Sequence, residues 1–205
     1  MLHYGHMSKE RLENFTDAVF AILMTILVLE LHAPSLPAHA SFGEYAQALG
    51  PLWPQFFSFS LSFFAIAVYW INHHYFFRYV RQVTIQMMWL NVLLLFIVAF
   101  IPFSTSLLGT NPTGQFPIVF YACNTLLAGA AFYALRSYVY RNQLYRCDAN
   151  EAIRTFGPWK SVPGVVLSAL AIAAAFINIP AALVFLSIYP AVYAVPGNIT
   201  IFENL

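Results

Sequence analysis

Six long apolar runs, separated by short polar segments, constrain this chain more than any other feature of its sequence. Each run has the length of a helix that crosses, or nearly crosses, a bilayer, and is too long for a strand of a transmembrane barrel. The runs cover about Phe15–His32, Pro51–Tyr75, Val83–Leu107, Phe116–Tyr138, Val162–Ile179 and Pro180–Val195. The last is short and is interrupted by Pro190. The sequence therefore predicts an all-α membrane protein, with six transmembrane helices in one domain over residues 1–205.

The low charge content excludes the main classes of soluble protein. Only 8% of the 205 residues are charged and 60% are hydrophobic, whereas roughly 25% are charged in an ordinary soluble domain. The 9 Lys+Arg and 8 Asp+Glu residues are too few to keep a soluble globule of this size dispersed. A water-soluble enzyme, a nucleic-acid-binding protein with a basic face and a disordered chain are therefore excluded.

The basic residues alternate between loops in a way that predicts the topology. Lys9 and Arg11 precede the first run, and Arg78 and Arg81 separate the second run from the third. The loops after the first, third and fifth runs contain neither lysine nor arginine. Since basic loops remain cytoplasmic, six spans place both termini in the cytoplasm. The other five basic residues, assigned to the segment between the fourth and fifth runs, are Arg136, Arg141, Arg146, Arg154 and Lys160.

The first run carries two acids, and a charged group inside a bilayer is a functional candidate by default. Asp17 lies about one turn into the run, which we expect to begin after Asn14 as its N-cap, and Glu30 lies near the outer end. Three interpretations of Asp17 remain open: a hydrogen-bonded network between helices, an interfacial pair with Arg11, or a proton relay. Glu30 either attracts cations at an outer mouth or is an ordinary interfacial acid.

Polar side chains at the far end of the second run lie at the depth of Asp17. A histidine there, with the indole N–H of Trp70 as a further donor, is a plausible partner for the carboxylate. Alternatively, Trp70, His73 and Tyr75 form an interfacial aromatic belt. His73 and His74 are adjacent, so they point to different sides of a helix and do not predict a metal site.

No motif for catalysis or for a known filter is present. The sequence contains no phosphate-binding glycine-rich loop, no HExxH or GxSxG motif and no Gly-Tyr-Gly filter segment. Its two cysteines, Cys123 and Cys147, give neither a disulfide framework nor the spacing of a metal site. We therefore expect no enzyme, and a channel would need a different kind of filter.

An apolar stripe follows one face of the first run. Ile22, Ile26 and Leu29 share this face, Thr25 flanks it, and Glu30 lies at its edge. Periodicity alone favours contact with lipid or with a neighbouring helix over lining of a pore.

Residues 11–31 resemble the signature of the transmembrane protein 175 family of endosomal and lysosomal potassium channels. That signature has an arginine, three residues, then Phe-Ser-Asp, opening an apolar helix with a threonine near its middle. Arg11, Phe15, Asp17 and Thr25 match it, and Thr16 stands where the family usually has serine. The six-run layout and the Trp70 to His74 end of the second run agree with the family over most of the chain.

This resemblance implies a homotetrameric channel, modestly selective for potassium over sodium, with the first helix of each subunit around the axis. It requires no cofactor and no metal; its partners are the bilayer, three further subunits and the permeant K⁺, with no nucleic acid. It implies an integral multi-pass protein, in the inner membrane if the source is prokaryotic. Mapped residue by residue, the constriction falls on Ile22, Ile26 and Leu29 beside Thr25, and a supporting polar network on Arg11, Thr16, Asp17, Trp70 and His73 or His74.

Two other classes of function remain as alternatives. A proton-coupled secondary transporter would use Asp17 with His73 or His74 as relay groups, but needs internal repeats that the sequence does not show clearly. An intramembrane enzyme or assembly factor is disfavoured because no second carboxylate or cysteine accompanies the histidines.

Overall fold

The computed structural model describes residues 8–146 and 157–194. Over these residues the fold is helical, and strand-like pairing is limited to an isolated antiparallel bridge between Val80 and Tyr145. The predicted all-α architecture is therefore confirmed. Cys147, Arg154 and Val195 lie outside the described residues. The elements are α1 Lys9–Ile26, η1 Leu27–Glu30, α2 Phe42–Leu49, η2 Gly50–Leu52, α3 Trp53–Arg78, α4 Ile85–Val98, α5 Ile101–Thr110, α6 Gln115–Arg141, η3 Pro158–Ser161, α8 Val162–Ala175 and α9 Ile179–Ala194.

Several helical stretches have the length and composition of membrane spans. In the part of the chain that the structure describes, five such stretches are found, and a sixth apolar helix, Ile179–Ile188, is shorter. Each corresponds to one of the predicted runs, and α9 corresponds to the short sixth run. The protein is thus an integral, multi-pass membrane protein. The five longer stretches are Lys9–Glu30, Phe42–Arg78, Ile85–Thr110, Gln115–Arg141 and Pro158–Ala175.

Two helix boundaries differ from the predictions. The first helix begins at Lys9, and its N-cap is Ser8, whose side chain accepts a hydrogen bond from the Arg11 backbone N–H; Asn14 is therefore inside the helix and is not its cap. The third run is two helices, α4 and α5, separated by Ala99 and Phe100. Pro102 explains this break, because proline lacks an N–H and its ring would clash with the Val98 carbonyl four residues earlier.

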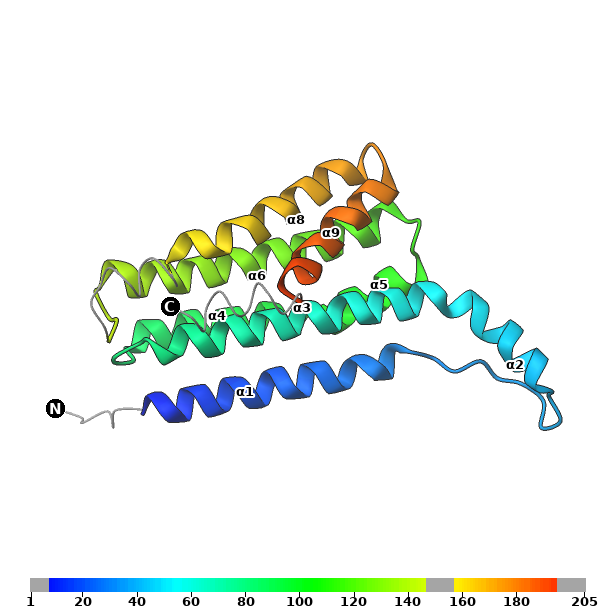
Figure 1. Ribbon diagram of the computed structural model, residues 1–205, viewed down its shortest axis with the longest axis horizontal. Helices are drawn as coiled ribbons and strands as arrows, with labels where there is room; N and C mark the ends of the chain where they lie inside the picture. Colours follow the sequence, from blue (N-terminus) through cyan, green and yellow to red (C-terminus); the bar gives the residue numbers. More distant parts are fainter. Residues whose placement is uncertain (1–7, 147–156, 195–205) are drawn as a thin grey trace.

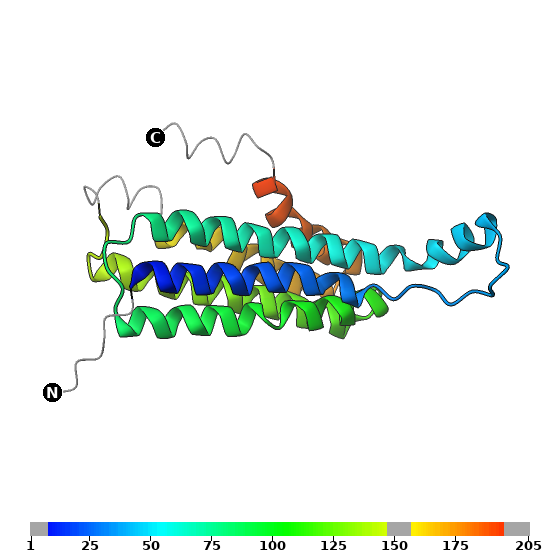
Figure 2. The ribbon, with the colours of Figure 1, turned by 90° about the horizontal axis from the view of Figure 1, so that it is seen from below.

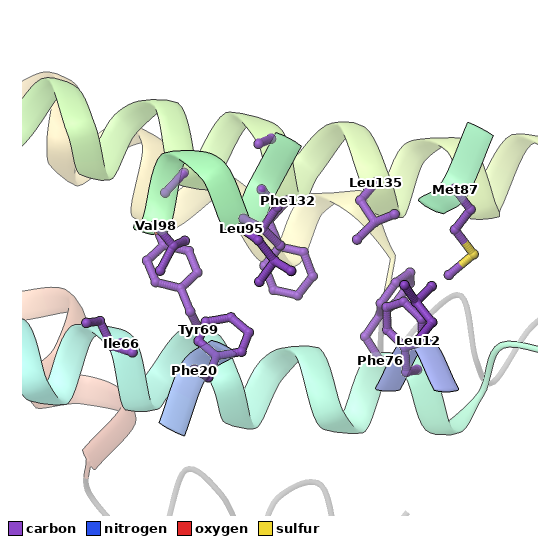
Figure 3. Packing of buried hydrophobic residues seen from close by; sticks show 14 of the residues in the cluster. Leu12, Phe20, Ile66, Tyr69, Phe76, Met87, Leu95, Val98, Phe132 and Leu135 are labelled. Atoms are coloured by element: carbon purple, nitrogen blue, oxygen red, sulfur yellow. The ribbon is translucent and has the colours of Figure 1, made fainter. Parts of the chain in front are cut away.

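The long helices lie side by side, with α1 at one edge of the bundle and α2 projecting beyond its end (Figure 1). Seen from below, α1 runs between α3 and the α4–α5 pair (Figure 2). Leu12, Phe20, Leu23 and Leu27 are buried and join side chains of α3, α4 and α6 in one apolar cluster (Figure 3). The first helix is thus anchored along one side only.

The described basic residues gather at one end of the bundle. This is the end at which α1 begins and α3 and α6 finish (Figure 1). Glu30 and Glu44 belong to the opposite end, in η1 and α2. The uneven distribution of basic residues between the loops of the sequence is therefore also an uneven distribution between the two ends of the bundle.

Candidate functional site

The face of α1 that points away from its own subunit is apolar and open. Ile22 is 58% exposed and Leu29 is 71% exposed, and Thr25 between them is exposed as well. No charged side chain lies on the helix between Asp17 and Glu30. An uncharged surface of this kind can border lipid, another subunit or a poorly hydrated ion path.

Ile26 is placed differently from the other two residues of the predicted stripe. It is half-buried and packs against the core cluster of its own subunit. The α-helix ends at this residue, and η1 continues as a tighter 3₁₀ turn over Leu27–Glu30. Since a 3₁₀ helix has fewer residues per turn, this change rotates Leu29 relative to an uninterrupted α-helix. The open stripe therefore consists of Ile22 and Leu29, with Ile26 at its inner edge.

The hydroxyl of Thr25 is oriented by its own helix. Thr25 Oγ1 lies 2.8 Å from the carbonyl oxygen of Ile22 and 3.1 Å from that of Ala21, so it donates its proton to the backbone. The oxygen lone pairs remain free to accept. An exposed hydroxyl fixed in this way presents partial negative charge to a cation.

Asp17 is held by Trp70, in agreement with one of the interactions considered from the sequence. The indole Nε1 of Trp70 donates to Asp17 Oδ1 at 2.9 Å, which links α1 to α3. His74 is exposed and lies beside Trp70, with the ring centroids 6.3 Å apart. The indole is a donor only, so this contact fixes the carboxylate without offering it a path for protons.

His73 does not bond to Asp17 but belongs to a second, buried chain of hydrogen bonds between side chains. Its Nε2 lies 2.8 Å from Asn91 Oδ1, and Asn91 Nδ2 donates to Thr16 Oγ1 at 2.8 Å. With this amide orientation, His73 carries its proton on Nε2. The ring also stacks on Phe77 at 4.2 Å. Thr16 of α1, Asn91 of α4 and His73 of α3 therefore join three helices.

Asn91 was missed in the sequence analysis, although a signal was available. It is an amide within the strongly apolar third run, one turn and more beyond the N-terminal end of α4. Intramembrane amides usually hydrogen-bond across helices, so the position should have been treated as part of the network.

The two remaining candidates of the first helix lie outside these contacts. Arg11 is exposed and lies about three turns before Ile22 on the same face; among the described residues its side chain pairs with neither Asp17 nor Trp70. Glu30 is half-buried in η1, and its carbonyl oxygen is 3.0 Å from His32 Nδ1. No group of three metal-ligating side chains occurs in the described ranges.

Comparison with known proteins identifies the family. Residues 11–102 match the family described as "Endosomal/lysosomal potassium channel TMEM175". A potassium channel of Chryseobacterium sp. is 31% identical over 192 residues, which cover 94% of this chain and 95% of that protein. The chain belongs to the TMEM175 family. A potassium channel of Chamaesiphon minutus is 33% identical over 168 residues, covering 79% and 82% of the two chains.

Solved structures and animal relatives of the TMEM175 family extend this result. The crystal structure of a lysosomal potassium-selective TMEM175 homologue from Chamaesiphon minutus has a TM-score of 0.79 at 28% identity, covering 93% of this chain and 98% of that one. The mouse protein, named endosomal/lysosomal proton channel TMEM175, is 33% identical over 137 residues. This match covers 63% of the present chain but only 28% of the mouse protein.

Arg136 is a further intramembrane polar residue of this TMEM175 chain. It was assigned to the segment between the fourth and fifth runs, but it lies inside α6 and is 2% exposed. Its guanidinium is 4.2 Å from the Phe132 ring centroid, and it donates to Asn72 Oδ1 and Ser161 Oγ, each at 3.4 Å. The assignment was wrong because Arg136 lies within the fourth run, which ends at Tyr138, and the helix covers the whole of that run.

The buried Asn91 chain predicts a loss of stability when the amide is removed from the TMEM175 fold. Replacing Asn91 with leucine leaves Thr16 Oγ1 and His73 Nε2 without partners, so the free energy of unfolding should fall by about 1–3 kcal/mol. Thermal unfolding in detergent measures this. Asn14→Leu is the matched control, because Asn14 is exposed. Equal losses in both variants would contradict a structural role for the buried chain.

Proposed function

We propose that this protein is a potassium-selective cation channel whose pore is enclosed by the first helices of four identical subunits. Each subunit supplies one six-helix domain, with its basic end, and hence both termini, in the cytoplasm. The channel uses no cofactor, and K⁺ is the permeant ion. Names and structures of the bacterial relatives support this assignment.

The open, uncharged face of α1 is the observation that carries the proposal. Rings of Ile22 and Leu29 from four subunits would narrow the path and resist wetting, with Ile26 supporting them from behind. A cation must shed part of its hydration to pass, and K⁺ loses water more readily than Na⁺. Modest selectivity then requires no carbonyl-lined filter.

The polar contacts behind α1 keep this face in position. Asp17 is tied to Trp70, and Thr16 is tied through Asn91 to His73. We infer that these contacts have a supporting role. The alternative of a proton-coupled transporter, with Asp17 and His73 or His74 as relay groups, loses support, because the side chain that donates to Asp17 is Trp70 and His73 is hydrogen-bonded to Asn91 instead. The animal relatives are named proton channels, so proton permeability is the outcome to distinguish from potassium permeability.

Reversal potentials in a planar bilayer test the function directly. The purified protein is placed between a potassium solution on one side and a sodium solution on the other. The current should reverse at a non-zero potential whose sign shows that K⁺ permeates more readily than Na⁺. The same measurement under a pH gradient at symmetric potassium measures proton permeability. A current that follows only the proton gradient, or a flux that requires a counter-ion gradient, would contradict the proposal.

Thr25 provides a second test, because its hydroxyl lies within the proposed path. Thr25→Val removes the oxygen with little change in volume, so the reversal potential between potassium and sodium should move toward zero. Thr25→Ser keeps the hydroxyl and should keep the selectivity. If the valine variant retains full selectivity, the apolar rings alone set the discrimination.

A further inference from the structure

Two loops at the basic end of the bundle are joined by their backbones. The Arg81 N–H donates to the Leu144 carbonyl at 2.7 Å, and the Arg146 N–H donates to the Tyr79 carbonyl at 2.7 Å. These bonds flank the antiparallel bridge between Val80 and Tyr145. The loop between α3 and α4 is therefore fixed beside the segment that follows α6.

The bridge brings two exposed arginine residues close together. Val80 is fully buried and Tyr145 is 8% exposed, whereas Arg81 and Arg146, the next residue along each segment, are both exposed. They are diagonal neighbours across the bridge, a relation that places residues roughly 7–8 Å apart. Two guanidinium groups at this separation can converge on a single phosphate.

Among the described residues, no acidic side chain neutralises this pair of positive charges. Residues 78–84 and 141–146 contain no acid, and Arg78 and Arg141 add two further exposed charges beside the pair. None of these four arginines forms an ion pair with a described residue. Burial raises the pKa of Tyr145 to about 12, so the ring that anchors the bridge remains neutral.

Exposed aromatic rings place this surface at the level of lipid headgroups. Tyr140 and Trp159 are 41% and 44% exposed and form an edge-to-face pair with centroids 6.3 Å apart. Amphipathic rings of this kind concentrate at membrane interfaces. Tyr140 immediately precedes Arg141 at the end of α6, and the segment that carries Arg146 follows this end, so the aromatic pair and the arginines lie at the same end of the bundle.

We propose that Arg81 and Arg146 form a clamp for the phosphate of an anionic phospholipid headgroup. The backbone bonds hold the two arginines together before the lipid arrives, which distinguishes this clamp from the diffuse attraction of scattered basic residues. The inference does not depend on the ion that the channel conducts, because a lipid clamp and a pore in α1 are separate features.

Binding of phosphatidylglycerol to the full-length protein in detergent, measured by native mass spectrometry, tests the clamp. The double variant Arg81→Gln, Arg146→Gln should weaken phosphatidylglycerol binding roughly 30-fold. The matched control Arg78→Gln, Arg141→Gln removes the same charge at the same end and should weaken it only about threefold. Phosphatidylcholine should bind weakly to all three proteins, and glycerol phosphate should not displace the lipid.

The remaining variants separate a lost clamp from a lost fold. Arg81→Lys with Arg146→Lys keeps the charge but not the bidentate geometry, so its binding should lie between the wild-type and glutamine values. Thermal unfolding of each variant checks that the bundle is intact. Equal losses in the two glutamine pairs, or no loss in either, would overturn the clamp. Displacement of the lipid by glycerol phosphate at equal concentration would instead identify a site for soluble phosphates.

Discussion

Replacing Ile22 with alanine should raise the potassium current about tenfold and weaken the discrimination against sodium. The substitution removes three carbons from each of four side chains in the proposed ring, so the path becomes wider and easier to wet. A tenfold rise corresponds to a barrier lower by about 1.4 kcal/mol. The current per amount of reconstituted protein and the bi-ionic reversal potential measure the two effects.

A matched substitution away from α1 separates widening of the pore from general loosening of the protein. Ile85 at the start of α4 is 59% exposed, almost the same as the 58% of Ile22. Ile85→Ala therefore removes the same atoms from an equally open position and should leave current and selectivity unchanged. Leu29→Ala should act in the same direction as Ile22→Ala. Potassium flux that is unchanged by both α1 substitutions would show that this face does not line the pore.

The fold was largely predictable because apolar length is a strong signal for membrane helices. Each of the six runs corresponds to one or more helices of the structure. The boundaries were less predictable, because they depend on single residues. Ser8 competes with Asn14 as a cap, and Pro102 ends α4 at Val98 through a clash that run length does not reveal.

The site was predictable only in part, because some of its hydrogen-bond partners are distant in the sequence. Residues of the first helix could be placed by the family resemblance. The similar depth of Asp17 and of the far end of the second run correctly predicted Trp70 as a donor to Asp17. That argument could not decide which residue His73 would bond, since the partner lies on α4, distant in sequence. Asn91 became visible only when the packing of α1, α3 and α4 was known.

The charged groups of the spanning helices show the same dependence on packing. Asp17 and Arg136 are separated by most of the chain, yet both are held by residues of α3: Trp70 for the acid and Asn72 for the base. Helix α3 therefore connects the first helix with α6. A change in the position of α3 would therefore alter the hydrogen bonds to Asp17 on α1 and to Arg136 on α6.

Replacing Arg136 with alanine should lower the free energy of unfolding by about 3 kcal/mol. The variant loses the stacking on Phe132, leaves Asn72 Oδ1 and Ser161 Oγ without this donor, and opens a cavity between α3, α6 and η3. Arg136→Met fills much of that cavity without restoring the hydrogen bonds, so it should recover about half of the loss. Unfolding in detergent by denaturant titration measures both variants.

Arg141 supplies the comparison that decides whether burial causes this effect. It lies on the same helix but is exposed, so Arg141→Ala should change stability by no more than about 0.5 kcal/mol. A large loss for Arg136→Ala with a small loss for Arg141→Ala shows that the buried guanidinium links α3 to α6. If instead the methionine variant is as stable as the wild type, packing at this position suffices and the polar contacts of Arg136 add nothing to stability. The order of the three variants thus separates the contribution of volume from that of hydrogen bonding.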